Sequence, residues 1–113
     1  MRRSWNRSVQ RGDPYERRVP KGVGHEQSGR RFGVIVQSDA LLPRSVVLLA
    51  PTSTGDRPAS LRPETRVQGA ITRVLVEQVG AVDASRLGRQ VGRVGVEEMW
   101  NIDESLATVL GLT

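Results

Sequence analysis

The sequence of 113 residues has no cysteine and one histidine, His25. This excludes disulfide bonds, thiolate metal sites and a zinc site built from several imidazoles. No apolar run approaches the ~20 residues that a membrane-spanning helix needs. Aromatic residues make up 4% of the chain, so base stacking has few side chains to use. We expect a cytoplasmic protein with no membrane partner, no metal and no other cofactor.

Arginine supplies almost all of the positive charge. Of the 17 lysines and arginines only Lys21 is a lysine, and the formal net charge is +5. Guanidinium groups bind phosphates through two parallel hydrogen bonds, so this bias favours RNA, DNA or an acidic protein segment as a partner. An arginine-rich proteome encoded by a high-GC genome explains the same composition without a partner.

The first half of the chain alternates between loops and short strands. We expect a flexible basic tail over residues 1–11 and a single domain over residues 12–113. A strand over residues 15–19 would place Pro14 at its start or on a sheet edge, because proline cannot donate to a ladder. Residues 20–31 contain three glycines and no apolar period, which predicts a long loop.

Strands are predicted next over residues 32–37 and 46–50. Both runs are continuously apolar, which is typical of strands buried on both faces. Residues 51–63 are rich in Pro, Ser, Thr and Gly, which predicts another loop.

The second half predicts a hairpin, further short elements and a helix. Strands over residues 64–67 and 70–79 flank a tight turn at Gln68 and Gly69. Asp83 can cap a helical turn at residues 84–87, and residues 91–94 are predicted to form the last strand.

From Glu97 onward the apolar residues follow a helical period. The resulting stripe consists of Met99, Ile102, Leu106, Val109 and Leu110. Gly111 lies where a left-handed cap would end this helix. About six strands separated by short connections predict a mainly β domain with a C-terminal helix, in which the sheet is mostly antiparallel and curls into a small barrel.

Several segments, in this order and spacing, resemble the MazF/PemK/Kid toxins of bacterial toxin–antitoxin pairs. The segments are RGD (11–13), GHEQSGRR (24–31), QSD (37–39), LAPTST (49–54), VEQV (76–79), DASRLG (83–88) and the LGL (110–112) that follows the helix. The resemblance implies an SH3-like barrel that acts as a homodimer and is inhibited by a cognate antitoxin. It also implies a metal-independent, sequence-specific endoribonuclease that cuts single-stranded RNA and leaves a 2′,3′-cyclic phosphate and a 5′-hydroxyl.

The resemblance carries roles to individual residues. Arg31 matches the catalytic arginine and Ser53 the catalytic threonine or serine of the family. Glu26 and Gln27 match the loop beside the substrate, and Gln78 matches a position near the RNA. Further contacts to RNA are expected from Lys21, Arg30, Thr52 and Arg57.

The same chemistry can be argued from the residue types. Arg31 can place two N–H groups on a phosphoryl oxygen pair, and Ser53 can add a hydroxyl donor. Arginine stays protonated in proteins, so Glu26 or His25 is the better general base. Taken singly, each arginine could be a solvated strand flank and Ser53 a turn residue.

Two other function classes remain open at this stage. One is a non-catalytic SH3-like toxin of the CcdB type that inhibits a protein such as DNA gyrase. The other is a structural nucleic-acid-binding barrel without chemistry. Inhibited supercoiling with intact RNA would favour the first, and retention of uncut RNA the second.

Overall fold

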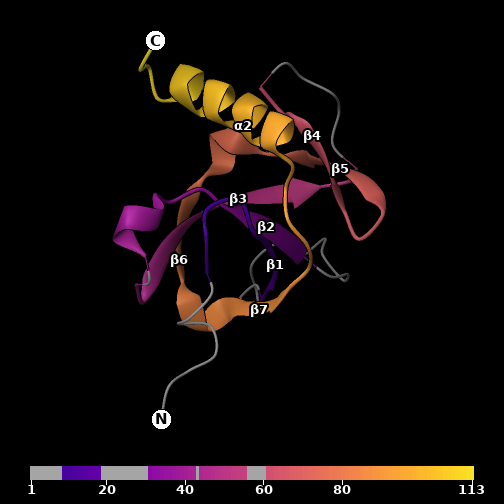
Figure 1. The fold of residues 1–113 in the computed structure, drawn as a ribbon, viewed down its shortest axis with the longest axis vertical. Coiled ribbons are helices and arrows are strands. Elements are labelled where there is room, and N and C mark those ends of the chain that lie inside the picture. Colours follow the sequence, from indigo (N-terminus) through magenta and orange to yellow (C-terminus); the bar gives the residue numbers. More distant parts are fainter. Residues whose placement is uncertain (1–8, 19–30, 43, 56–60) are drawn as a thin grey trace.

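The computed structural model describes residues 9–18, 31–42, 44–55 and 61–113. These residues form one curled sheet with an α-helix, α2 (Val96–Val109), packed on one face (Figure 1). The strands are β1 (Pro14–Arg17), β2 (Arg31–Ile35), β3 (Val46–Ser53), β4 (Glu64–Val67), β5 (Ala70–Val74), β6 (Gly80–Asp83) and β7 (Leu87–Gln90). The strand order is β4-β5-β3-β2-β1-β7, with β6 paired to β3. Every pairing is antiparallel, as predicted, although the sheet curls without closing.

Strand β3 organises the sheet because it pairs with three other strands. One edge pairs with β2, and the other pairs with β6 in the first half and β5 in the second. The predicted loop at Pro51 is wrong, since β3 continues to Ser53. Pro51 lies opposite Gly33, and its carbonyl accepts a hydrogen bond from the Leu75 N–H at 2.8 Å. The N and C=O of one strand residue point to the same side, so the N–H that proline lacks would face Leu75, and the β2–β3 ladder loses no hydrogen bond.

Burial of β3 on both faces is also wrong for the first half of the strand. Val46 and Leu48 are 48% and 44% exposed, whereas Val47 and Leu49 between them are buried. This alternation has the period of two expected for a strand with one solvated face. The prediction failed because apolar side chains occupy both faces here.

The sequence locates the first strands well. Strand β1 begins at Pro14, and the first position of a strand is one where proline is compatible with a sheet. It lies between β2 and β7 rather than at an edge. Strand β2 begins at Arg31, one residue before the predicted start, and ends at Ile35.

The β4–β5 hairpin has the predicted turn. Gln68 and Gly69 have φ angles of 52° and 83°, which is typical of a type I′ turn. The predicted strand over residues 70–79 is too long: β5 ends at Val74, and the 3-10 helix η2 (Val76–Gln78) and β6 follow.

The predicted helical turn after Asp83 is confirmed. The Asp83 side chain accepts from the Ser85 N–H and caps the 3-10 helix η3 (Ala84–Arg86). The last strand is β7, not residues 91–94, because β7 is the segment that pairs with β1. The 3-10 helix η1 (Asp39–Leu41) lies between β2 and β3.

Helix α2 confirms the predicted amphipathic element. Its stripe packs against a core of buried side chains made of Val34, Val36, Ala50, Val74, Val76, Val94 and Ile102. The Glu98 carboxylate accepts from the Gly95 N–H at the helix start and from the Thr65 hydroxyl, each at 3.0 Å. Gly111 has a φ of 73°, the expected left-handed cap. Leu110 is 57% exposed and does not join the core.

A second core fills the inside of the curled sheet. It consists of Val9, Tyr15, Ile35, Val47, Leu49 and Leu87. The contacts of the fold therefore extend to residues that precede Gly12. In the described part of the chain, no helix has the length and apolar character needed to cross a bilayer.

Candidate active site

One row of side chains crosses the sheet where β2 begins and β3 ends. The β2–β3 ladder ends with the pair Gly33 and Pro51, and the Thr52 hydroxyl still donates to the Phe32 carbonyl one residue further. Continued by one more residue, this register brings Arg31 opposite Ser53. Opposite residues of antiparallel strands share a face. The two residues expected to be catalytic therefore lie on neighbouring strands, on the inner face of the curl.

Two further arginines, which the sequence analysis did not single out, lie in the same row. Arg17 of β1 pairs with Arg31, and Arg73 of β5 pairs with Ser53. We call Arg17, Arg31, Ser53 and Arg73 the arginine row. Arg17 lies two residues after the buried Tyr15, so the strand period could have placed it on the inner face. Its partner strand could not be known from local sequence.

Arg17 and Arg31 hold like charges side by side, and both are partly buried. Burial lowers the pKa of Arg17 below its ordinary value, and the positive charge of Arg31 lowers it further. The Nε of Arg17 donates to the Phe32 carbonyl at 3.3 Å. On the other side of Ser53, Arg73 forms an ion pair of 2.5 Å with Glu64.

The Ser53 hydroxyl has one defined partner in its own turn. Its oxygen accepts from the Gly55 N–H at 3.2 Å. Because a hydroxyl also carries one proton to donate, this contact leaves the donor available to a ligand. Thr52 points to the other face, and its hydroxyl donates to the Phe32 carbonyl at 3.4 Å.

Gln78 lies outside the arginine row. It is exposed in η2, just before Gly80 pairs with Leu49. Leu49 is four residues from Ser53, or about 13 Å along β3. Beside Gln78, burial alone would raise the pKa of Glu77, but hydrogen bonds from Arg62 at 2.8 and 3.0 Å hold it below its usual value.

Six of the residues expected at the site lie outside the described residues. They are Lys21, His25, Glu26, Gln27, Arg30 and Arg57. Both candidate general bases belong to this group. Among the residues that are described, no three His, Cys, Asp or Glu side chains gather as a metal site would require.

The RGD segment has a structural place in the fold. The backbone N–H of Arg11 donates to Asp39 at 2.7 Å, and its guanidinium bonds the Val36 carbonyl at 2.8 Å and Asp103 at 2.6 Å. Gly12 has a φ of 92°, a conformation that favours glycine. The segment thus ties β2 and η1 to helix α2.

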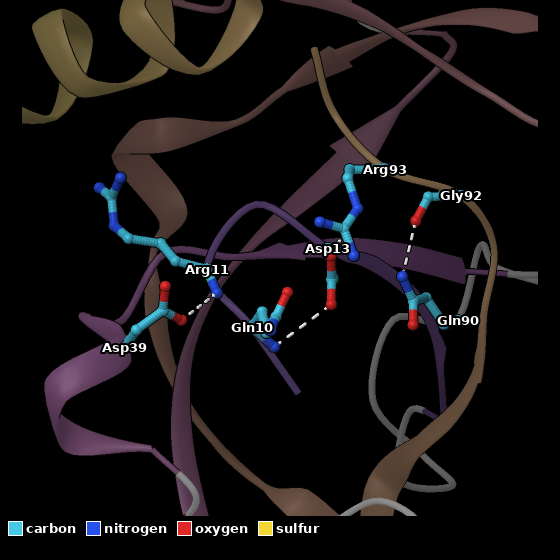
Figure 2. Close-up of polar contacts among 7 residues, drawn as sticks. All are labelled: Gln10, Arg11, Asp13, Asp39, Gln90, Gly92 and Arg93. Atoms are coloured by element: carbon cyan, nitrogen blue, oxygen red, sulfur yellow. Dashed lines mark hydrogen bonds and ion pairs between the residues drawn. The ribbon is translucent and has the colours of Figure 1, made fainter. Parts of the chain in front are cut away.

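Asp13, the last residue of this segment, is a buried carboxylate (Figure 2). It is 1% exposed, and it accepts from the Gln10 N–H at 3.2 Å and lies 3.8 Å from the Arg93 Nε. Burial raises the pKa of Asp13 although Arg93 lowers it. In the same view, the Gln90 amide donates to the Gly92 carbonyl at 2.9 Å.

Comparison with known proteins identifies the family to which the chain belongs. Residues 10–110 match the model of the PemK-like, MazF-like toxins of type II toxin–antitoxin systems. The chain belongs to this family. It is 40% identical over 90 residues to the toxin candidate Rv3098A of Mycobacterium tuberculosis. The aligned region covers 79% of this chain and 84% of that protein.

Solved MazF structures share the fold. An endoribonuclease from a mycobacterial species, in complex with its cognate antitoxin, superimposes with a TM-score of 0.75 at 22% identity, over 94% of this chain and 98% of that one. MazF from Deinococcus radiodurans gives a TM-score of 0.75 at 19% identity, over 91% and 96% of the two chains. The predicted mainly β, MazF-like fold is therefore confirmed.

Proposed function

We propose that this MazF-like toxin is a metal-independent, sequence-specific endoribonuclease that cuts single-stranded RNA. The 2′-hydroxyl attacks the neighbouring phosphorus, and the products are a 2′,3′-cyclic phosphate and a 5′-hydroxyl. The observation that carries the proposal is the pairing register, which supports a joint action of Arg31 and Ser53 on one phosphodiester. Membership of the toxin family supports the same reaction class.

In the proposed mechanism Arg31 stabilises charge. Attack by the 2′-oxygen creates a pentacoordinate phosphorus with added negative charge on its non-bridging oxygens. A guanidinium held by a rigid sheet can donate two N–H bonds to these oxygens without reorganising during the reaction. The partly buried position of Arg31 strengthens this interaction, because water screens it less.

Ser53 supplies a third donor in the same mechanism. Its oxygen already accepts the Gly55 N–H, so its proton points to a different partner. A non-bridging phosphoryl oxygen between β2 and β3 is such a partner. The mechanism thus assigns Arg31 the larger effect and Ser53 the smaller one, since only Arg31 is charged.

The proton transfers are assigned to other groups. The 2′-hydroxyl must lose a proton, and the leaving 5′-oxygen must gain one. Arg31 is a donor only, so it cannot act as the base. We assign the base to Glu26 or His25. Because Arg31 stays protonated, it stabilises charge and orients the phosphate, and the proton for the 5′-oxygen comes from the other of these two groups or from water.

The proposal is tested by incubating the protein with a long RNA in EDTA and mapping the fragment ends. We expect discrete cuts with cyclic phosphate termini, which would establish class, specificity and metal independence together. Intact RNA would refute the nuclease, and inhibition of gyrase supercoiling in the same preparation would favour the CcdB-type alternative. RNA retained on a gel but never cut would favour a structural barrel.

The proposed partners are a second copy of the chain and a cognate antitoxin. A solved relative is in complex with its antitoxin. We expect an acidic antitoxin segment to bind the arginines that bind RNA, because carboxylates and phosphates match the same donors. A synthetic acidic segment should then compete with RNA in a binding assay. Simultaneous binding of both would contradict a shared site.

The second partner is another copy of the chain, and a monomer in sedimentation analysis would contradict the homodimer. A cytoplasmic location is part of the same proposal, because RNA is the substrate.

A further inference from the structure

The position of Arg17 beside Arg31 lowers the stability of the fold unless an anion binds between or near the two side chains. Arg17 lies directly opposite Arg31 in the β1–β2 ladder. Like charges at opposite positions destabilise a sheet, and partial burial of a guanidinium adds a desolvation cost. Both effects lower the pKa of Arg17. An anion between or beside the two guanidiniums would offset both costs.

Of the described arginines that form no ion pair with a described carboxylate, Arg18, Arg44 and Arg66 are exposed, and Arg86 is partly buried near the charge of Asp83, whereas Arg17 is partly buried beside a like charge. Five other arginines of the described residues have a carboxylate partner. These are Arg11 with Asp103, Arg62 with Glu77, Arg73 with Glu64, Arg89 with Glu16 and Arg93 with Asp13. Arg17 forms no ion pair with a carboxylate of the described residues. Its Nε bonds the Phe32 carbonyl, which fixes the side-chain stem, and its terminal nitrogens make no hydrogen bond within the described part of the chain.

We propose that Arg17 binds a phosphate of the RNA strand next to the phosphate that is cleaved. This inference rests on the proposed function and identifies a binding residue that the reaction itself does not require. Arg31 and Ser53 already offer three donors to the two non-bridging oxygens of the cleaved phosphate. Arg17 lies one strand away from Arg31, about 5 Å between backbones. A long side chain at that spacing reaches an adjacent phosphate of the same strand.

The binding test uses a short single-stranded RNA with 2′-O-methyl groups, which cannot be cleaved. Its Kd is measured over a series of salt concentrations for the wild type, Arg17→Met and Arg89→Met. Arg89 is the matched control, because it lies on the neighbouring strand β7, is exposed and pairs with Glu16 on the opposite face of β1. Arg17→Met should weaken binding about tenfold and reduce the slope of log K against log salt by about 0.7. Arg89→Met should leave the slope unchanged.

The cleavage test separates binding from chemistry. With a cleavable RNA, Arg17→Met should raise KM about tenfold and leave kcat within a few-fold of the wild type. Arg17→Lys keeps the charge and should retain the salt slope with an intermediate KM. Thermal unfolding is followed for each variant, and Arg17→Gln, which keeps an N–H donor near Phe32, replaces Arg17→Met where the latter unfolds early.

The outcomes distinguish this inference from the proposed function. If the wild type cuts RNA and Arg17→Met has the wild-type salt slope and KM, the inference about Arg17 is refuted and the proposed nuclease is not. A loss of kcat at constant KM also refutes the inference about Arg17. An unchanged RNA slope with weakened binding of an acidic peptide would assign Arg17 to a protein partner instead. A wild type that binds but never cuts RNA refutes the nuclease, and the salt series still decides whether Arg17 contacts a phosphate.

Discussion

Two adjacent rows on the inner face of the same three strands differ completely in chemistry. One row consists of Tyr15, Gly33 and Pro51, and the next consists of Arg17, Arg31 and Ser53. Tyr15 is 4% exposed and Gly33 is buried, whereas both arginines are only partly buried. The rows are two residues apart, or about 7 Å along each strand. The face thus changes from packed core to charged rim within a single repeat of the strand.

This comparison teaches how a small sheet can hold a preorganised charged site. The apolar row is rigid because Leu49 fills the space above Gly33, where an added Cβ would lie 2.3 Å from a Leu49 methyl. This packing also holds the backbone of the arginine row in place, because the two rows are adjacent on the same strands. The arginine row therefore combines positions set by a core with side chains that reach a ligand.

The largest expected effect comes from removing the central charge of the arginine row. Arg31→Ala should reduce kcat by about 10²- to 10³-fold, because the charged transition state loses its main donor. Folding should be largely intact, since the packed row beside it is untouched, and RNA binding should be largely retained. Single-turnover cleavage and thermal unfolding measure the two effects. Arg44→Ala, at an exposed arginine that bonds the Leu41 carbonyl, is the control. Cleavage by Arg31→Ala at the wild-type rate would refute the proposed mechanism.

Loss of the hydroxyl in the same row should have a smaller effect. Ser53→Ala removes one hydrogen bond to a charged oxygen, which is worth about 1.5–3 kcal/mol, or roughly tenfold to a hundredfold in kcat. Ser53→Thr keeps the hydroxyl and should stay within a few-fold of the wild type. Equal losses in both variants would show that shape, not hydrogen bonding, matters at this position.

In the apolar row the expected effect is on stability rather than on chemistry. Gly33→Ala forces a methyl against the Leu49 side chain and should reduce the free energy of unfolding by about 1–3 kcal/mol. Gly55→Ala is the matched control, because nothing lies within 4 Å of a Cβ at that glycine. Chemical denaturation measures both. An unchanged midpoint for Gly33→Ala would show that the sheet yields here and does not hold the arginines rigidly.

Local signals predicted the parts of this fold that depend on local physics. Helix α2 follows from its apolar period, its end from Gly111, and the β4–β5 turn from Gln68 and Gly69. The extent of β3 and the identity of the last strand were missed because partner strands decide them. The same limit applies to the site. Arg31 and Ser53 are predicted from resemblance alone, and the pairing that brings Arg17 beside Arg31 could not be predicted, because it joins separate segments of the chain.

Asp13 lies further from the arginine row than Tyr15 does, and its carboxyl group is completely buried, whereas Arg17 and Arg31 are partly buried. Asp13, which directly precedes β1, is 1% exposed, and burial raises its pKa above the ordinary 3.8. Its contribution to stability is therefore fully present below the unfolded-state pKa and is lost as the pH rises through the folded-state pKa.

The Asp13→Asn variant should lack this loss. The difference in free energy of unfolding, wild type minus variant, should fall as the pH rises from about 4 toward 7. Denaturation at several pH values measures it, with Glu104→Gln as an exposed control on α2. A difference that grows with pH would mean that attraction to Arg93 outweighs burial.

The smallest expected effect concerns Arg73, the arginine of the row whose charge is paired. The variant tests whether this ion pair is what distinguishes Arg73 from Arg17. Glu64 neutralises Arg73, whereas no carboxylate of the described residues pairs with Arg17. Glu64→Gln should free Arg73 for a phosphate and tighten RNA binding by less than tenfold, with a salt slope steeper by about 0.7. Stability should change by at most about 1 kcal/mol, because exposed ion pairs contribute little. Weaker RNA binding by Glu64→Gln would mean that Glu64 positions Arg73 for RNA rather than competing with it.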